Sequence, residues 1–83
     1  MTPEMIEKFL NNPARKKVPV NIHFKQRNTV KGVFLRTNDY NDLKAKNFWR
    51  IVSDSKLEEW ERTQDNTLAR IFNGAEFTRL SEN

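Results

Sequence analysis

Two predicted strands joined by a short polar link, the first with strictly alternating apolar residues, place the strongest limit on how this chain can fold. In residues 18–25 every second position is apolar: Val18, Val20, Ile22 and Phe24. A period of two predicts a strand with one buried and one solvated face. A second apolar run covers residues 29–37, and residues 26–28 between the runs are polar. The pattern therefore predicts an antiparallel hairpin.

Gly32 lies in the middle of the second predicted strand. A glycine inside a strand weakens it, and it usually marks a sharp bend or a close approach of another backbone. Residues 33–35 follow as three apolar residues in a row, which indicates that both faces are covered there. A strand that is bent and then buried on both sides predicts a small, strongly curved sheet or barrel.

The segments on either side of this hairpin predict a helix and a third strand. Residues 3–12 carry an apolar stripe at helical spacing, after a threonine that can cap the helix and a proline suited to its first turn. Pro13 ends the helix, because the residue before a proline is pushed out of the helical region. Residues 36–42 read as a polar turn and residues 43–52 as a third strand.

The second half of the chain is less decisive. Residues 53–64 fit either a short helix or a long third strand in a protruding hairpin, and a turn follows at residues 64–66. Two short apolar runs, 68–72 and 76–80, surround Asn73-Gly74-Ala75. Asn-Gly is the strongest short signal for a hairpin turn, so a plain hairpin is one interpretation of this block.

Composition limits the class of protein. Eighty-three residues make one domain with a modest core, which oligomerisation would help to stabilise. The net charge is +4, and the basic residues concentrate in residues 1–50, a surface suited to a polyanion. The absence of cysteine fits a reducing cytoplasm, and no signal peptide or membrane span is expected. Nothing pairs the carboxylates with a base, nucleophile or metal set, so we expect no enzyme, cofactor or small-molecule substrate.

The spacing around Gly32 resembles the first motif of the Sm-like family. Phe34, Asn38-Asp39-Tyr40, Asp42 and Leu43 fall at plus two, plus six to eight, plus ten and plus eleven from that glycine. Upstream, Phe9-Leu10-Asn11 and Val18-Pro19-Val20 are similar, without a gap, to the start of the bacterial Hfq family. The block around Asn73-Gly74 resembles the second Sm motif.

The resemblance implies a mainly β fold: an N-terminal helix followed by a small, strongly bent five-stranded antiparallel Sm-like barrel. It divides the single domain 1–83 into the helix 3–12, a first motif 18–43, an atypical insertion 46–67 and a second motif 68–80. It implies a homo-oligomeric ring, a hexamer by preference, that binds single-stranded RNA and acts as an RNA chaperone in post-transcriptional regulation. The RNA-binding residues it implies are Tyr40, Asp39, Asn73, Gly74, Arg15, Lys16, Lys17 and Lys31.

Alternatives remain for these residues and for the function. Tyr40 either stacks on a base at the inner rim of the ring or packs over the end of the barrel. Residues 15–17 are either a phosphate-binding rim or a solvated linker. Asp39 and Asn73 stand where the Hfq family has other residues, and residues 53–65 are acidic. These features favour a second function, a protein-interaction or assembly module with little affinity for RNA.

Overall fold

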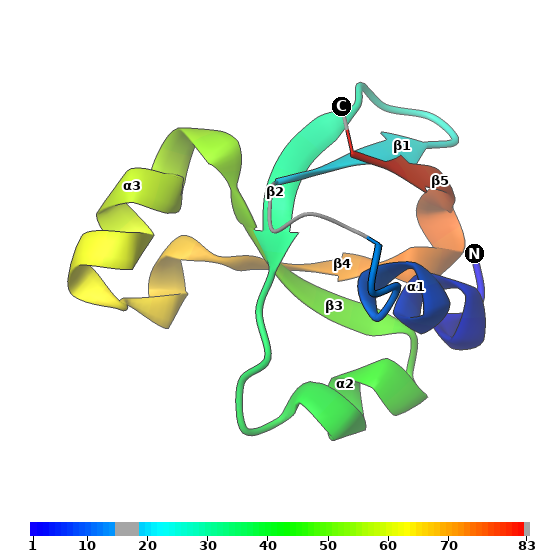
Figure 1. Cartoon of the computed structure of the whole chain (residues 1–83), viewed down its shortest axis with the longest axis horizontal. Helices are drawn as coiled ribbons and strands as arrows, with labels where there is room; N and C mark the ends of the chain where they lie inside the picture. The colour runs from blue at the N-terminus through cyan, green and yellow to red at the C-terminus, as the bar shows by residue number, and fades with distance from the viewer. Residues whose placement is uncertain (15–18, 83) are drawn as a thin grey trace.

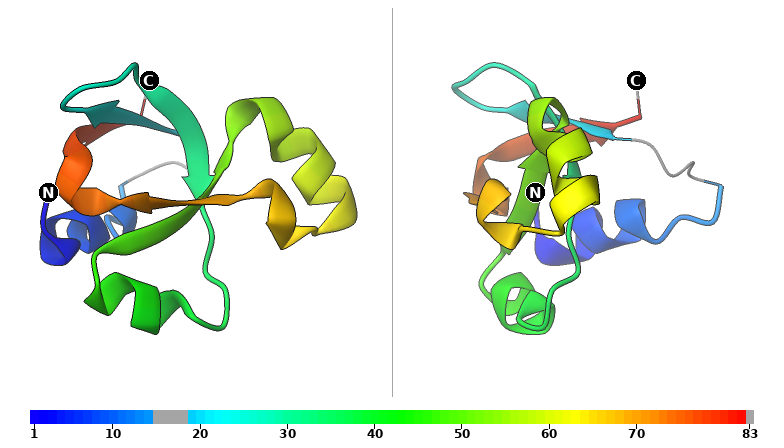
Figure 2. Two further views of the ribbon diagram at one scale, coloured as in Figure 1. Left: turned by 180° about the vertical axis from the view of Figure 1, so that it is seen from behind. Right: turned by 90° about the vertical axis from the view of Figure 1, so that its left-hand side faces the viewer.

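The computed structural model describes residues 1–14 and 19–82, and in them three α-helices surround one antiparallel sheet (Figure 1). The helices and strands, in chain order, are α1 (Pro3–Leu10), β1 (Val20–Phe24), β2 (Val30–Phe34), α2 (Tyr40–Ala45), β3 (Phe48–Ser53), α3 (Asp54–Thr63), β4 (Arg70–Asn73) and β5 (Phe77–Ser81). Short 3-10 helices at Asn66–Leu68 and Gly74–Glu76 precede β4 and β5. Figure 2 shows α3 projecting from the sheet on the side opposite α1.

The five strands follow the order β4-β3-β2-β1-β5, with every neighbouring pair antiparallel. The predicted hairpin is confirmed, because Val20 pairs with Gly32 and Ile22 with Val30. β4 and β5, the last two strands along the chain, lie on opposite edges of the sheet. The interpretation of Asn73-Gly74 as a plain hairpin turn is therefore wrong, since the strands that it joins do not pair with each other.

The link between β4 and β5 requires the sheet to curl. In a flat five-stranded sheet the two edges would lie about 19 Å apart, at about 4.8 Å per strand. The connection is the 3-10 helix Gly74–Glu76, and such a helix rises only about 2 Å per residue. It can join the two edges only because the sheet bends strongly and brings them together, as the orange coil at the right of Figure 1 shows.

Gly32 lies where β3 approaches the backbone of β2 closely. A Cβ atom at this position would stand 2.5 Å from the backbone oxygen of Val52 and 2.8 Å from a methyl group of Ile51. Both contacts are shorter than real Cβ atoms show, so only glycine fits without a shift of β3. The predicted close approach of a backbone to this glycine is confirmed.

The core fills the concave side of the curled sheet. The alternation in β1 is confirmed, with Val20 and Ile22 fully buried. They form one cluster with residues from three other elements, α1, β3 and β5: Ile6, Trp49, Ile51, Phe77 and Leu80. Burial of each large apolar side chain stabilises the fold by about 1.5–3 kcal/mol. Ile6 belongs to α1, so the amphipathic N-terminal helix covers the core as its apolar stripe predicts.

Two expectations from the sequence need correction. The predicted third strand 43–52 is wrong in its first half, because residues 40–45 form α2 and β3 begins only at Phe48. Helical spacing aligns Tyr40 with Lys44, and both side chains bond Glu7 of α1, which a strand would not allow. The description as mainly β is also too strong, since the α-helices hold nearly as many of the described residues as the strands do.

The alternatives at residues 53–64 are resolved in favour of a helix. α3 follows β3 directly and contacts both β2 and β3. It ends at Thr63. The left-handed backbone of the next residue, Gln64 (φ 57°), lets the chain turn, and Asp65 then caps the following 3-10 helix. The predicted turn at residues 64–66 therefore lies between two short helical elements.

Candidate nucleic-acid interface

The predicted basic rim, Arg15, Lys16 and Lys17, lies outside the described residues. Lys31 does lie within them. It is exposed on β2, opposite Asn21 of β1. Its ammonium group is therefore available at the surface of the hairpin.

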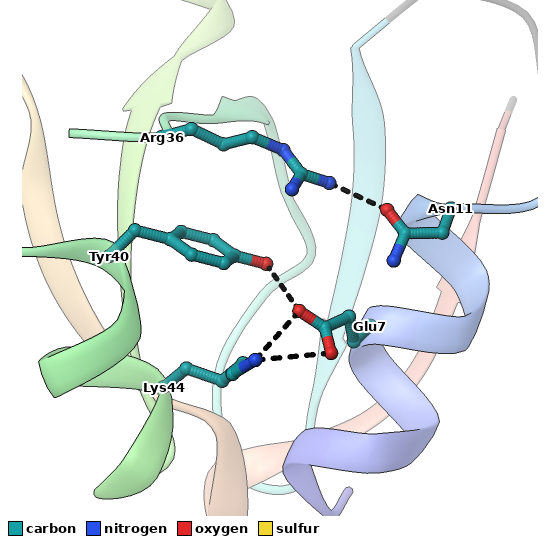
Figure 3. Close-up of polar contacts among 5 residues, drawn as sticks. All are labelled: Glu7, Asn11, Arg36, Tyr40 and Lys44. Atoms are coloured by element: carbon teal, nitrogen blue, oxygen red, sulfur yellow. Dashed lines mark hydrogen bonds and ion pairs between the residues drawn. The ribbon is translucent and has the colours of Figure 1, made fainter. Parts of the chain in front are cut away.

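Tyr40 is the first residue of α2 and is half-buried. Its ring meets the indole of Trp49 edge-on, with 6.0 Å between centroids, and the Arg36 guanidinium lies 5.0 Å from the ring centroid. Its hydroxyl donates a hydrogen bond of 3.2 Å to Oε2 of Glu7 (Figure 3). Burial, above all, raises the pKa of the phenol. These contacts favour the packing interpretation of Tyr40 over a free stacking platform.

Glu7 connects α1 to α2 at this point. Its carboxylate accepts hydrogen bonds from Nζ of Lys44, at 3.1 and 3.3 Å, as well as from Tyr40 (Figure 3). The Lys44 hydrogen bond is the largest cause of the lowered pKa of Glu7. Nearby, Arg36 donates to Oδ1 of Asn11 at 2.7 Å, which ties the chain after β2 to the end of α1. We call these five residues the α1–α2 clamp.

Asp39 is paired within the molecule. Its carboxylate lies 2.9 Å from the guanidinium of Arg50, and it accepts a hydrogen bond from the hydroxyl of Thr37. The Thr37 hydrogen bond is the first cause of the lowered pKa of Asp39, and the charge of Arg50 also lowers it. Because Arg50 offsets the charge of Asp39 locally, the repulsion that this carboxylate would exert on a phosphate is weakened.

Asn73 and Gly74 also have internal partners. The side chain of Asn73 accepts a hydrogen bond of 2.9 Å from the backbone N–H of Ala75, which caps the short helix before β5. The amide of Gly74, which could otherwise bond a base, donates to the backbone oxygen of Asn47 at 2.8 Å. Gly74 is buried, and a Cβ atom there would collide with Asn47, Ile6 and Trp49. Gly74 therefore has a packing role.

Both motif turns lie against Trp49. The ring of Tyr40 packs against that indole at an interplanar angle of 72°. A Cβ atom on Gly74 would stand 2.8 Å from Nε1 of Trp49. The structure thus brings Tyr40 and Gly74 to the same buried indole.

An open groove of about 710 Å³ lies between α3 and the chain that leaves β2. We call it the α3 groove. Its lining residues are Val33, Phe34, Leu35, Arg36, Thr37, Asn38, Asp39, Arg50, Trp60, Gln64 and Asn66. The half-buried indole of Trp60 is fixed by a hydrogen bond of 3.1 Å from its Nε1 to Asn66. The aromatic ring comes from α3, and the guanidinium groups come from Arg36 and Arg50 on the sheet side.

The α3 groove combines the groups that bind nucleotides. An indole can stack on any base, and guanidinium groups can bind phosphate or stack in turn. The side-chain amides of Asn38, Gln64 and Asn66 add donors and acceptors for base edges. Among the predicted site residues that the structure describes, only Asp39 lines this groove.

Sequence reasoning missed Trp60 and Arg50, both of which lie in the segment 46–67 that the motifs leave out. One signal was present, because Trp60 is a large aromatic residue inside a helix that is otherwise mostly polar and charged. A helix of that composition has little apolar surface to bury, so a lone tryptophan suggests a binding role.

Other site chemistries find no support in the described residues. No group of three or more histidine, aspartate or glutamate side chains in residues 1–14 and 19–82 could hold a metal ion. The single histidine, His23, bonds Ser81 and Thr29 on the outer side of β1. Over the same residues, no helix has the length and apolar composition needed to cross a bilayer.

A scan against protein-family models and searches of curated proteins and of solved structures gave no match to this chain.

Proposed function

We propose that this chain is a non-enzymatic RNA-binding protein of Sm-like fold, which binds single-stranded RNA as a homo-oligomeric ring. The observation that carries the proposal is the α3 groove, whose lining combines Trp60 with Arg36 and Arg50. Its setting is the cytoplasm, and its role is that of an RNA chaperone in post-transcriptional regulation.

The fold is compatible with this proposal. An N-terminal helix precedes five antiparallel strands in a strongly curled sheet, as the Sm resemblance implies. β4 and β5 occupy the two edges of the sheet, so each leaves backbone groups without a strand partner within the sheet.

The two edges also support ring assembly. β4 of one copy can pair with β5 of the next, and closed cyclic symmetry would cover every edge without forming fibres. Ile71 of β4 is a large apolar side chain with 52% of its surface exposed, which pairing with a neighbour would bury. We expect a hexamer, and light scattering at micromolar concentration measures its mass. A monomer at all concentrations would contradict ring assembly.

The groove is tested by the affinity of Trp60 variants for labelled oligouridine at low salt. Loss of one stacked base costs about 1–3 kcal/mol, so Trp60→Ala should bind about 5- to 150-fold more weakly. Trp60→Phe keeps an aromatic face and should retain most of the affinity. Leu57→Ala is the matched control, since Leu57 is a half-buried apolar residue of the same helix that does not line the groove.

The result would contradict the proposal if folded Trp60→Ala bound oligouridine as tightly as the parent. Melting curves of all three variants establish that each is folded. Loss of binding in Leu57→Ala to the same degree would instead show that α3 acts only through stability.

A second candidate function is an assembly module of the same fold with little affinity for RNA. The internal hydrogen bonds of Tyr40, Asn73 and Gly74 favour it, since all three predicted base contacts have partners within the molecule. A ring that forms normally in solution but does not bind oligouridine at low salt would support this function over the first.

A further inference from the structure

A second, smaller hollow lies between the β1–β2 loop, the first turn of α3 and β4. Its volume is about 210 Å³, and it shares no lining residue with the α3 groove. We call it the cationic pocket. The apolar part of its lining comes from Val30, Ile51, Leu68 and Phe72, and the polar part comes from Arg27, Ser53, Lys56 and Arg70.

The charges of the cationic pocket are of one sign. Arg27, Lys56 and Arg70 come from three elements that are distant in the sequence, and no carboxylate lines the pocket with them. The ion pairs in the described part of the chain are Lys44–Glu7 and Arg50–Asp39, so neither involves these cations. Three like charges around one hollow repel each other, and a bound anion would remove that repulsion.

Two of the three cations are placed in ways that suit ligand binding. The guanidinium of Arg27 lies 5.0 Å from the ring centroid of Phe24 and 5.6 Å from that of Phe72. These contacts hold its planar fork at the pocket without using its hydrogen bonds. Lys56 stands in the first turn of α3, where the helix dipole disfavours a positive charge.

From this arrangement we infer that the cationic pocket binds a phosphate monoester that carries a small apolar or aromatic body. Arginine forks bind phosphate oxygens in pairs, and the hydroxyl of Ser53 adds a further donor. The hollow is smaller than the range of about 300–1,000 Å³ typical of sites for drug-sized ligands, so it fits one phosphate and one ring. Phe72 and Leu68 supply the apolar contact.

A phosphate monoester of this kind has two natural sources, a free nucleoside monophosphate and the 5′-phosphorylated end of an RNA strand. The inference does not depend on RNA binding in the α3 groove, because the two sites are built from different residues. A protein that fails to bind internal RNA could still bind either ligand in the cationic pocket.

The test is calorimetric titration of the full chain with adenosine 5′-monophosphate and, separately, with adenosine. We expect the monophosphate to bind and adenosine to bind at least about tenfold more weakly, because a charge-assisted hydrogen bond contributes more than a neutral one. Lys56→Gln and Arg70→Gln should each weaken monophosphate binding by about tenfold or more. Both residues are exposed, so both variants should fold.

Arg62→Gln is the matched control, since Arg62 is an exposed cation of α3 that lines neither hollow. The inference is overturned if the monophosphate does not bind, if adenosine binds equally well, or if Arg62→Gln weakens binding as much as the pocket variants do. Oligouridines with and without a 5′-phosphate identify the source. A strand end is the ligand if the 5′-phosphorylated strand binds more tightly than both the unphosphorylated strand and the free monophosphate. A free nucleotide is the ligand otherwise.

Discussion

Gly74 offers the sharpest test of the structure, because the family resemblance and the fold assign it different roles. The resemblance implies a base contact, whereas the structure buries Gly74 between α1 and β3. A Cβ atom at this position would stand 2.7 Å from Cδ1 of Ile6 and 2.8 Å from Nε1 of Trp49, and it would also collide with the side-chain oxygen of Asn47. Gly74→Ala should therefore destabilise the fold.

The size of the destabilisation follows from these contacts. Forced movement of packed side chains costs about 1–3 kcal/mol. Asn47 accepts a hydrogen bond of 2.8 Å from Nε1 of Trp49, and breaking that bond costs about 1–3 kcal/mol more, because the indole is buried. The alanine recovers about 0.4–1 kcal/mol by restricting the unfolded chain. The net destabilisation is about 3 kcal/mol, which lowers the melting temperature of a domain of this size by roughly 12–24 °C.

Thermal unfolding followed by circular dichroism measures this destabilisation. Ala75→Gly, the reverse exchange at an exposed position of the same turn, is the control and should cost about 1 kcal/mol or less. Asn47→Gly removes one of the colliding groups and suits the left-handed backbone of residue 47 (φ 61°). The double variant should therefore be destabilised by less than the sum of the two single variants. A melting temperature of Gly74→Ala within about 3 °C of the parent would refute the reasoning.

Three further predictions concern the α1–α2 clamp and the predicted basic rim, residues 15–17. The pKa of Glu7 in the folded protein lies below its ordinary value of 4.5, so the stability it contributes is complete above that pH and is lost as the pH falls through the lowered pKa. Urea unfolding of the parent should show this pH dependence, and Glu7→Gln should show a smaller one, because the lowered pKa of Asp39 contributes with the same sign. Tyr40→Ala should cost about 2 kcal/mol in urea unfolding, roughly half the value for a fully buried aromatic residue. Unchanged stability with weakened oligouridine binding would restore the stacking interpretation. Alanine at residues 15–17 together should reduce the slope of RNA affinity against salt by about one unit for each phosphate that the variant no longer neutralises, and an unchanged slope would make the segment a solvated linker.

Local patterns predicted the first part of the fold well, because the decisive interactions there are local. The alternation in residues 18–25 and the glycine at position 32 depend on strand geometry alone, and both predictions are confirmed. α2 was missed because its stability comes from outside the helix. It is short and mostly polar, and its contacts with Glu7 of α1 depend on a residue more than thirty positions away.

The hairpin prediction at Asn73-Gly74 failed for a similar reason. Asn-Gly favours a hairpin when the flanking strands are free to pair with each other. Here β3 and β1 are the partners of β4 and β5, so the pairing is decided by the whole sheet. Gly74 is needed because other side chains approach it closely, and its φ is not positive. A dipeptide signal cannot distinguish these two reasons for a glycine.

The proposed RNA chemistry therefore belongs to the part of the chain that the motifs do not cover. Tyr40, Asn73 and Gly74 match the motifs, yet each has a hydrogen-bond partner within the molecule. Asn47 explains much of this, because its carbonyl accepts a hydrogen bond from the Gly74 amide and its side chain fixes Trp49. A base approaching that turn would have to displace these buried partners. In the α3 groove a base would meet the indole of Trp60 beside an open space, so binding there requires no rearrangement of the core.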